Sequence, residues 1–194
     1  MRYYPAFLDL ARRRCLVVGG GAVAERKVRA LLACGAKVVV VSPVVVRPLA
    51  ELARQGRVEW RRRRFQRGDV RRAFLAVAAT DDEAANQAVW REAKRWHHLV
   101  NVVDRPALCS FIVPSVFSRG DLAIAVSTRG VSPALSRWIR QDMGARYGPW
   151  AGRVLERMGR WRRMVHREFR SPTLRKRRLQ ELLRRELKQA GMRL

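Results

Sequence analysis

The chain has 194 residues, of which 42 are Lys or Arg and 16 are Asp or Glu, giving a formal net charge of +26 and a pI of about 11.8. Hydrophobic residues make up 48%, too many for a disordered chain. No apolar run reaches the ~18 to 20 residues that span a bilayer, and no uninterrupted apolar stretch precedes the arginines at 12–14. We therefore expect a folded cytoplasmic protein without a membrane partner.

The first predicted elements form a strand, a helix and a second strand. Residues 14–18 are a short apolar run that ends at three glycines, which is typical of a buried parallel strand entering a tight turn. From Ala22 the apolar residues follow a helical period until Cys34 and Gly35, and residues 36–42 form a second β-branched run. The segment therefore predicts a β-α-β unit of the usual ~30 residues.

The same alternation continues to residue 103. We expect a helix over 44–55, strands at 57–60 and 74–79, a helix over 82–96 with Asp81 as its cap, and a strand at 99–103. Strands that alternate with helices predict an α/β fold with a doubly wound parallel sheet of the Rossmann type.

The pattern changes after Pro106. We expect strands at 111–114 and 121–127 joined by a polar turn at 118–120, a helix beginning at Ser132-Pro133, and only helices beyond Gly148-Pro149. Residues 153–193 hold fifteen Lys or Arg against four Glu. The expected domains are a dinucleotide-binding domain over 1–112, a small α+β region over 113–147 and a helical region over 148–194.

The glycine turn at 19–24 fits the pattern G-x-G-x-x-A, placed after a strand and at the start of a helix. Gly19 permits the tight turn, Gly21 lets a pyrophosphate approach the backbone, and Ala24 allows close packing of helix on strand. A merely structural glycine turn is the alternative. The predicted pyrophosphate contacts are Gly19, Gly21, Ala22 and Val23, where the helix offers free amides.

The second strand lacks the acidic residue that usually binds the adenosine ribose. We expect the ribose to meet Ser42, Pro43 and Val44 instead. No Arg directly follows the second strand to bind the 2′-phosphate of NADP. Arg47 lies close enough in the sequence that NADP is the alternative cofactor. The predicted cofactor is therefore NAD.

Four blocks of the sequence together resemble one family. They lie at 15–27 (CLVVGGGAVAERK), 78–82 (AATDD), 101–111 (NVVDRPALCSF) and 125–133 (AVSTRGVSP). Their order and spacing are similar to those of precorrin-2 dehydrogenases, the family that includes the N-terminal module of siroheme synthase. One departure is Thr128, which stands where some relatives have a serine that can be phosphorylated.

The resemblance implies NAD-dependent oxidation of precorrin-2 to sirohydrochlorin, on the route to siroheme or cobalamin. Some relatives also insert ferrous iron, so Fe²⁺ is a further substrate implied by the family. The family analogy implies a homodimer with a Rossmann domain, a central dimerisation region and a helical C-terminal part, here without a methyltransferase module.

Asp104 is the predicted catalytic residue. It follows a strand's carboxyl end, where ligands bind in open parallel sheets, and it matches the catalytic carboxylate of the family's motif. Oxidation of a reduced tetrapyrrole leaves a proton for such a base to accept. A turn Asp before Arg105-Pro106 is the alternative reading.

Further site residues are predicted around this carboxylate. Thr80 and Asp81 are expected on the nicotinamide side, with helix capping as the alternative role of Asp81. The expected substrate contacts are Asn101, Ser110, Ser127, Thr128 and Ser132, although Asn101 also suits a strand end and Ser132 a helix start. The arginines are expected to meet substrate carboxylates.

Other readings of the chain remain. Its charge suits a nucleic-acid-binding protein on a Rossmann scaffold, but no helix-turn-helix, zinc-finger or aromatic RNA-binding motif is present, so no nucleic-acid partner is expected. A chelatase would use the same cleft. We expect no resident metal, because the neighbouring His97 and His98 would point opposite ways on a strand. The three cysteines are expected to be buried, reduced thiols.

Overall fold

The structure is a computed structural model that describes residues 3–192. The chain divides into two compact units, residues 1–112 and residues 113–194, here called unit 1 and unit 2. No helix among residues 3–192 combines the length and the apolar character that crossing a membrane requires.

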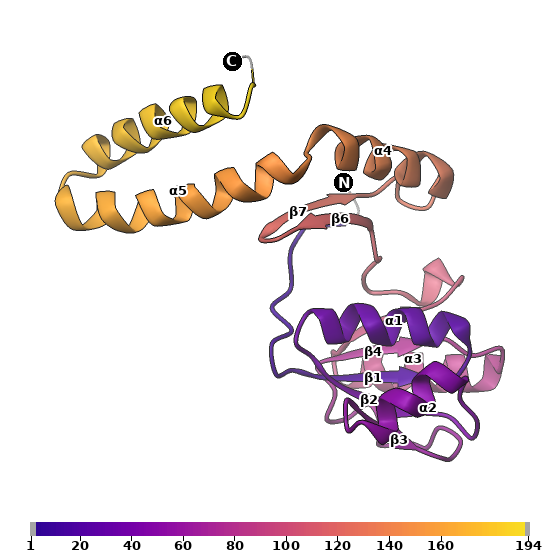
Figure 1. Cartoon of the computed structure of the whole chain (residues 1–194). Helices are drawn as coiled ribbons and strands as arrows, with labels where there is room; N and C mark the ends of the chain where they lie inside the picture. The colour runs from indigo at the N-terminus through magenta and orange to yellow at the C-terminus, as the bar shows by residue number, and fades with distance from the viewer. Residues whose placement is uncertain (1–2, 193–194) are drawn as a thin grey trace. The chain divides into compact units, whose positions relative to one another are not determined.

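Unit 1 is built on a five-stranded parallel sheet in the order β3-β2-β1-β4-β5 (Figure 1). Its strands are β1 (Arg14–Val18), β2 (Lys37–Val41), β3 (Val58–Arg61), β4 (Leu75–Ala78) and β5 (Leu99–Val102), and its helices are α1 (Ala22–Ala33), α2 (Arg47–Arg54) and α3 (Glu83–Arg95). The strand order reverses between β1 and β4, which is where a doubly wound sheet opens a crevice at its carboxyl edge. The predicted fold class is confirmed.

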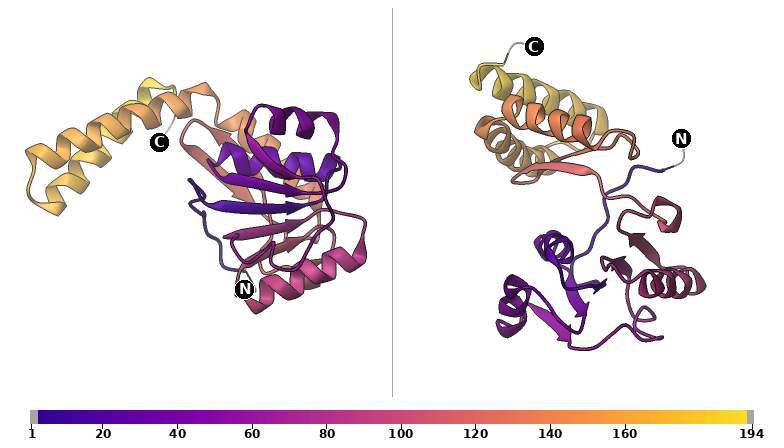
Figure 2. Two further views of the ribbon diagram at one scale, coloured as in Figure 1. Left: turned by 90° about the horizontal axis from the view of Figure 1, so that it is seen from below. Right: turned by 90° about the vertical axis from the view of Figure 1, so that its right-hand side faces the viewer.

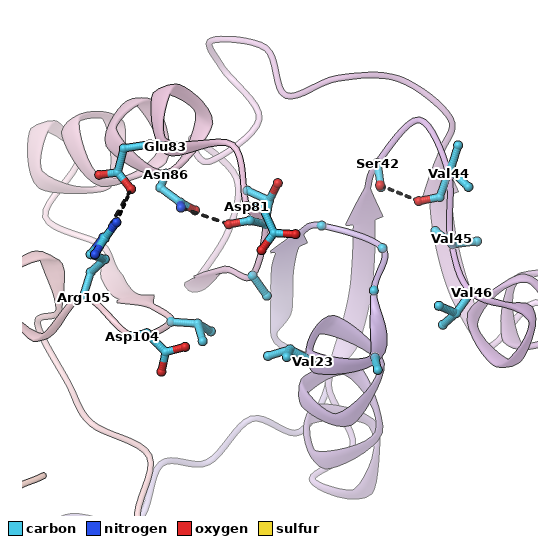
Figure 3. A pocket seen from close by; sticks show the side chains of 17 residues that line it. Val23, Ser42, Val44, Val45, Val46, Asp81, Glu83, Asn86, Asp104 and Arg105 are labelled. Carbon is cyan, nitrogen blue, oxygen red and sulfur yellow. Dashed lines mark hydrogen bonds and ion pairs between the residues drawn. The ribbon is translucent and has the colours of Figure 1, made fainter.

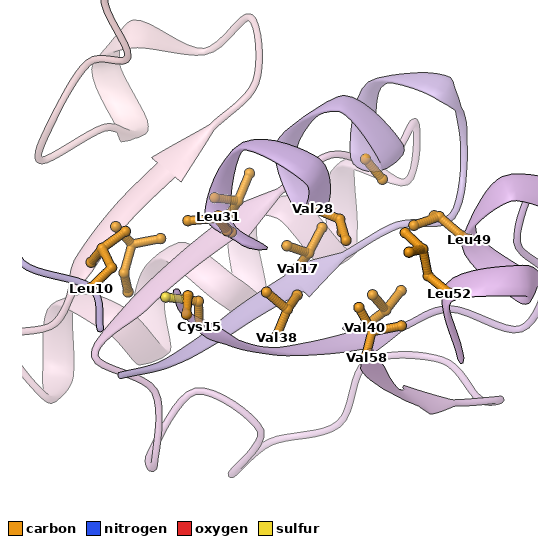
Figure 4. Packing of buried hydrophobic residues seen from close by; sticks show 14 residues of the cluster. Leu10, Cys15, Val17, Val28, Leu31, Val38, Val40, Leu49, Leu52 and Val58 are labelled. Atoms are coloured by element: carbon orange, nitrogen blue, oxygen red, sulfur yellow. The ribbon is translucent and has the colours of Figure 1, made fainter. Parts of the chain in front are cut away.

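Both faces of the sheet are buried, which explains why the strands are apolar throughout. Alternate residues of β1 point to opposite faces. Val17 packs toward α1 and α2, among Val28 and Leu49 (Figure 4), whereas Leu16 belongs to a second cluster that contains Val89 of α3. Burying each such side chain contributes ~1.5 to 3 kcal/mol, so the sheet needs helices on both sides.

Unit 2 is an antiparallel hairpin followed by three helices. The elements are β6 (Ser115–Arg119), β7 (Leu122–Val126), α4 (Pro133–Arg146), α5 (Pro149–Glu168) and α6 (Pro172–Gln189). Helix α4 approaches the hairpin closely, since a Cβ at Gly144 would lie 3.4 Å from the ring of Phe117.

Helices α5 and α6 run side by side (Figure 2) and are linked by a buried carboxylate. Glu186 accepts a hydrogen bond from Trp161 Nε1 at 3.1 Å and pairs with Arg157. The bond from Trp161 and the charge of Arg157 lower the pKa of Glu186. Glu186 therefore fastens α6 to α5.

Three predicted elements are wrong at their boundaries. The first strand of the hairpin is Ser115–Arg119 rather than 111–114, because Phe111 is held beside β5 by a bond to Asn101. The helix after Pro43 begins at Arg47, because Val46 N donates to Gly20 O at 2.8 Å. Asp82, not Asp81, caps α3 by accepting from Ala85 N at 3.0 Å.

The cysteine and histidine expectations also need correction. Cys15 is buried and Cys109 half-buried, but Cys34 is exposed, because it is the C-cap residue between α1 and a left-handed Gly35. His97 and His98 follow α3 rather than lying on a strand. Among residues 3–192 no three His, Cys, Asp or Glu side chains gather closely enough to hold a metal ion.

Candidate functional site

A cavity of about 760 Å³ opens at the carboxyl edge of the sheet in unit 1 (Figure 3). Its wall comes from the glycine turn after β1, the segment after β2, the segment after β4 with the first turns of α3, and the segment after β5. These four segments meet because parallel strands end at one edge of their sheet.

Two of the three glycines are required by close packing. Gly19 has a φ of +125°, and a Cβ there would lie 2.0 Å from Ala79 O. A Cβ at Gly20 would lie 2.0 Å from Val44 O. Any side chain at either position would therefore collide with the backbone of a neighbouring strand end.

The third glycine faces open space. A Cβ at Gly21 would meet no atom within 4 Å, and Gly21 is the N-cap of α1 without a side-chain cap bond. Its backbone and the first amides of α1, at Ala22 and Val23, border the cavity. The turn thus offers a bare backbone and a positive helix end to an anion.

The segment after β2 is suited to a ribose. Ser42 is buried, and its hydroxyl donates to Val44 O at 2.6 Å, which leaves the Oγ free to accept from a ribose hydroxyl. Val44 lines the cavity, whereas Pro43 and Arg47 are absent from its wall. No charged side chain of this segment meets the cavity.

The opposite end of the cavity carries polar groups from the start of α3. Thr80 and Asp81 both line it, and Asp81 is exposed because Asp82 has taken the capping role. Asn86 is buried and donates to Thr80 O at 3.0 Å, while its Oδ1 has no partner. This orphaned acceptor suits the amide group of a nicotinamide, so the cavity fits a dinucleotide at both ends.

Asp104 stands in the same wall, directly after β5. It is exposed and has a φ of +58°, a left-handed conformation that turns the chain sharply. Its loop is fixed by the Cys109 sulfur, which accepts from Val102 N at 3.3 Å and lies 3.2 Å from both Val102 O and Arg105 O. Burial raises the pKa of the Cys109 thiol, so it stays a neutral structural group.

A lysine lies within electrostatic range of this carboxylate. Lys27 is one helical turn beyond Val23, which lines the cavity from α1. Burial and the neighbouring Arg26 lower the pKa of Lys27, and the charge of Asp104 acts in the opposite direction. Lys27 is not among the site residues predicted from the sequence, although it lies four residues after Val23 on the same helix.

The predicted substrate residues do not line this cavity. Asn101 is buried and donates to Phe111 O at 3.1 Å, and Ser110 Oγ accepts from Val100 N at 2.8 Å. Both therefore hold the segment after β5 against the strand. Within unit 2, Ser127, Thr128 and Ser132 lie in the turn before α4, where Thr128 Oγ1 donates to Ser132 O at 2.9 Å.

Several lining residues were not predicted. They are Gly20, Val45, Val46, Ala79, Glu83, Asn86, Val103 and Arg105. Glu83 and Asn86 occupy one face of the first turns of α3, a spacing that a helix after a strand end makes recognisable. Arg105 pairs with Glu83 at 3.1 Å and thereby joins the segment after β5 to α3.

The reversed sheet and the bare glycine turn define a dinucleotide-binding protein of the Rossmann class. Comparison with known families agrees. Residues 6–115 match the family described as putative NAD(P)-binding, and residues 119–146 match the family described as sirohaem biosynthesis protein central.

Individual relatives point the same way. A siroheme synthase of Actinobacillus pleuropneumoniae is 42% identical over 177 residues, covering 91% of this chain and 36% of the relative. That of Nitrosospira multiformis is 42% identical over 181 residues, covering 91% and 38%. The chain thus spans about a third of the length of the curated relatives it matches.

A solved structure matches nearly the whole chain. It is described as SirC, precorrin-2 dehydrogenase, and it has a TM-score of 0.81 and 30% identity, with 96% of this chain and 98% of that chain covered. The chain therefore belongs to the NAD-binding family of siroheme biosynthesis that includes the precorrin-2 dehydrogenases. The family predicted from the sequence is confirmed, and none of these comparisons supports the nucleic-acid-binding alternative.

Proposed function

We propose that the chain is an NAD-dependent oxidoreductase that converts precorrin-2 to sirohydrochlorin. The observation that carries the proposal is that Asp104 and the glycine turn line one cavity. A carboxylate beside a dinucleotide site is the arrangement that a dehydrogenation needs. The family membership and the resemblance to a precorrin-2 dehydrogenase structure support the same activity.

The reaction removes two hydrogens from the macrocycle, one as a hydride and one as a proton. Bound at this site, NAD⁺ would supply the acceptor for the hydride. The other leaves as a proton, and Asp104 is the group that accepts it, because its carboxylate is exposed in the cavity wall. Exposure also lets Asp104 pass the proton on to solvent before the next turnover.

The remaining residues of the cavity bind and orient. We assign pyrophosphate binding to the amides of Gly21, Ala22 and Val23, and the ribose hydroxyl to Ser42. Asn86 Oδ1 is the acceptor for the nicotinamide amide, with Thr80 and Asp81 beside it. The absence of a cationic side chain from the wall after β2 favours NAD over NADP.

The finer parts of the assignment concern substrate and assembly. We propose that Ser127, Thr128 and Ser132 contact the tetrapyrrole, and that Asn101 and Ser110 act by positioning the loop of Asp104, since their bonds are internal. A homodimer formed through unit 2 and a cytoplasmic location remain predictions. So does insertion of ferrous iron, in which Fe²⁺ is a substrate and the same carboxylate would accept pyrrole protons.

The decisive experiment replaces the carboxylate by its isosteric amide. Purified chain is mixed with precorrin-2 and NAD⁺, and NADH formation and the sirohydrochlorin spectrum are followed. Asp104→Asn is expected to lower kcat by about a hundredfold or more, the scale of a lost general base, with unchanged NAD⁺ affinity. The control is Asp121→Asn, an exposed carboxylate in the hairpin turn of unit 2.

Two results would refute parts of the proposal. Full turnover by Asp104→Asn would remove the carboxylate from the mechanism. Wild-type protein that binds NAD⁺ but never oxidises precorrin-2 would remove the activity itself. Mass spectrometry of the products with and without added Fe²⁺ separates dehydrogenation from metal insertion.

A further inference from the structure

Unit 1 contains a second cavity that the cofactor does not explain. It measures about 510 Å³ and lies between the segment that joins β3 to β4 and the second half of α3. We call it the arginine groove, because its wall includes Arg67, Arg71, Arg91 and Arg95. A pocket of this size suits a ligand as large as a nucleotide or a sugar phosphate.

The guanidinium groups of the arginine groove have no anionic partner within the part of the chain that the structure describes. Among residues 3–192, none of the four makes an ion pair with a carboxylate. The contrast is with Arg61 and Arg63 nearby in sequence, which both pair with the almost fully buried Asp69, at 3.0 and 2.7 Å. The positive charges of Arg61 and Arg63 are therefore neutralised beside the groove, whereas those of the four groove arginines are available to a ligand.

Two of these arginines are held in place by an aromatic ring. The guanidinium carbons of Arg71 and Arg95 lie 5.5 and 5.6 Å from the centre of the Trp96 ring. Such cation–π contacts restrict the side chains before any ligand arrives. An anion entering the groove consequently meets partly ordered donors, which lowers the entropic cost of binding.

The groove also contains an acceptor that lacks a donor. Glu92 is only 8% exposed, and its Oε1 accepts from Gly68 N at 2.8 Å. Its Oε2 is buried without any hydrogen-bond partner. A buried polar atom of this kind is costly unless something donates to it. A ligand for this site therefore needs a hydroxyl or N–H group as well as anionic groups.

We propose that the arginine groove binds a small phosphorylated metabolite that carries hydroxyl groups, such as a nucleotide or a sugar phosphate. The phosphates bind the guanidinium groups, whose planar forks match phosphate oxygens. A hydroxyl of the ligand donates to Glu92 Oε2 as the side chain of Arg67 or Arg91, the two groove arginines that do not lie against the Trp96 ring, turns outward to a phosphate. This proposal does not depend on the dehydrogenase activity.

The arginine groove is separate from the cofactor cavity. Helix α3 contributes to both, with Glu83 and Asn86 at its start lining one and Ala88 to Trp96 lining the other. The two walls share no residue. Saturating the protein with NAD⁺ therefore leaves the groove available, and a phosphate ligand that binds under this condition does so elsewhere than at the glycine turn.

Isothermal titration of the full chain, saturated with NAD⁺, tests the proposal. The probes are ATP, fructose 1,6-bisphosphate and inorganic pyrophosphate, which separate a nucleotide from a sugar phosphate and both from charge alone. One site is expected for at least one organic phosphate. The double variant Arg91→Gln/Arg95→Gln is expected to weaken it by about tenfold or more per arginine, the scale of charge-assisted hydrogen bonds.

The control is Arg64→Gln/Arg72→Gln, which removes the same charge from two exposed arginines outside the groove. Equal weakening by both double variants would show attraction to net charge and overturn the proposal. So would the absence of heat from every probe at millimolar concentration.

A second variant tests the acceptor. Glu92→Gln keeps an oxygen for Gly68 N and replaces the free acceptor by a donor. The affinity of the organic phosphate relative to that of pyrophosphate is expected to fall about tenfold, because only the organic ligand has an alcohol hydroxyl to donate. An unchanged ratio would contradict the assigned role of Glu92 and with it the hydroxylated ligand.

Discussion

The two units of the chain bury their apolar residues very differently. Unit 1 contributes 26 of the buried hydrophobic residues among residues 3–192, whereas unit 2 contributes five. In unit 2 several large apolar side chains are exposed, including Val131 at 82% and Trp138 at 62%. Unit 1 has a core on each face of its sheet, but the helices and hairpin of unit 2 enclose little.

This difference indicates that the units are stabilised in different ways. A β-α-β domain that covers both sides of its sheet is complete without further surfaces. Exposed aromatic and aliphatic side chains of the kind seen in unit 2 mark surfaces that bind other protein chains. The contrast supports the proposed dimerisation through unit 2, and three experiments test it.

The largest effect is expected at the glycine turn of unit 1. Gly19→Ala forces a Cβ to 2.0 Å from Ala79 O at a φ of +125°, and is expected to lower the free energy of unfolding by about 3 kcal/mol or more. Gly21→Ala meets open space at an ordinary φ of −82° and should leave stability unchanged. It is instead expected to weaken NAD⁺ binding by roughly tenfold, or about 1.4 kcal/mol.

Denaturant unfolding and NAD⁺ titration of both variants provide the measurement. Because unit 1 is complete in itself, the decrease in the free energy of unfolding caused by Gly19→Ala should not depend on protein concentration. The assignment of the two glycines would be wrong if Gly21→Ala unfolded as easily as Gly19→Ala, or bound NAD⁺ as tightly as the wild type.

An intermediate effect is expected on the exposed face of unit 2. Trp138→Asp places a charge where an aromatic side chain is available for contact, and is expected to weaken self-association by about 2 kcal/mol, or roughly thirtyfold. Trp138→Phe keeps an aromatic ring and serves as the control. Sedimentation velocity over a range of concentrations measures both, and an unaltered dimer in Trp138→Asp would place the interface elsewhere.

The smallest effect is a pH-dependent one in unit 1. Burial alone would raise the pKa of Asp69, but the hydrogen bonds from Arg63 and the Gln66 amide, with the charges of Arg63 and Arg61, hold it below its usual value. Asp69→Asn is expected to cost about 1.5 kcal/mol of unfolding free energy at pH 7.

The sign of the pH dependence follows from that lowered pKa. The stability from Asp69 is fully present above the unfolded-state pKa of about 4, and is lost as the pH falls through the folded-state value. The difference between wild type and Asp69→Asn should therefore shrink as the pH falls below about 4. Urea unfolding over this pH range measures the difference in free energy of unfolding. A constant difference would mean that the ion pairs of Asp69 contribute nothing to stability. Asp121→Asn, which removes the same charge, is the control.

The sequence predicted the parallel sheet well because its strands are apolar throughout and its first turn is rich in glycine. It failed where a distant partner determines the structure. Residues 111–113 are as apolar as a strand, yet Phe111 is bonded to Asn101, and the hairpin begins at Ser115 because its partner is Val126. Neither pairing is visible in local composition.

The candidate site was predictable in part for the same reason. Gly19, Gly21 and Asp104 lie at strand ends, which topology brings together, and they line one cavity. Asn86 and Lys27 were missed because their relevance depends on burial and on charges across the cavity. The sequence also offers two adjacent candidates for the cap of α3, Asp81 and Asp82. Which of them caps the helix depends on the residue at which the helix begins, and local sequence does not determine that residue.

The close approach of Gly20 to Val44 has a consequence for redesign of this protein. The glycine turn packs closely against the segments after β4 and after β2, at Ala79 O and at Val44 O. A change in one of these three loops therefore affects the other two. Engineering the loop at 42–46 to prefer a phosphorylated ribose would shift the carbonyl against which Gly20 is fitted. Coenzyme preference in this protein is thus tied to the geometry of the turn and must be altered together with it.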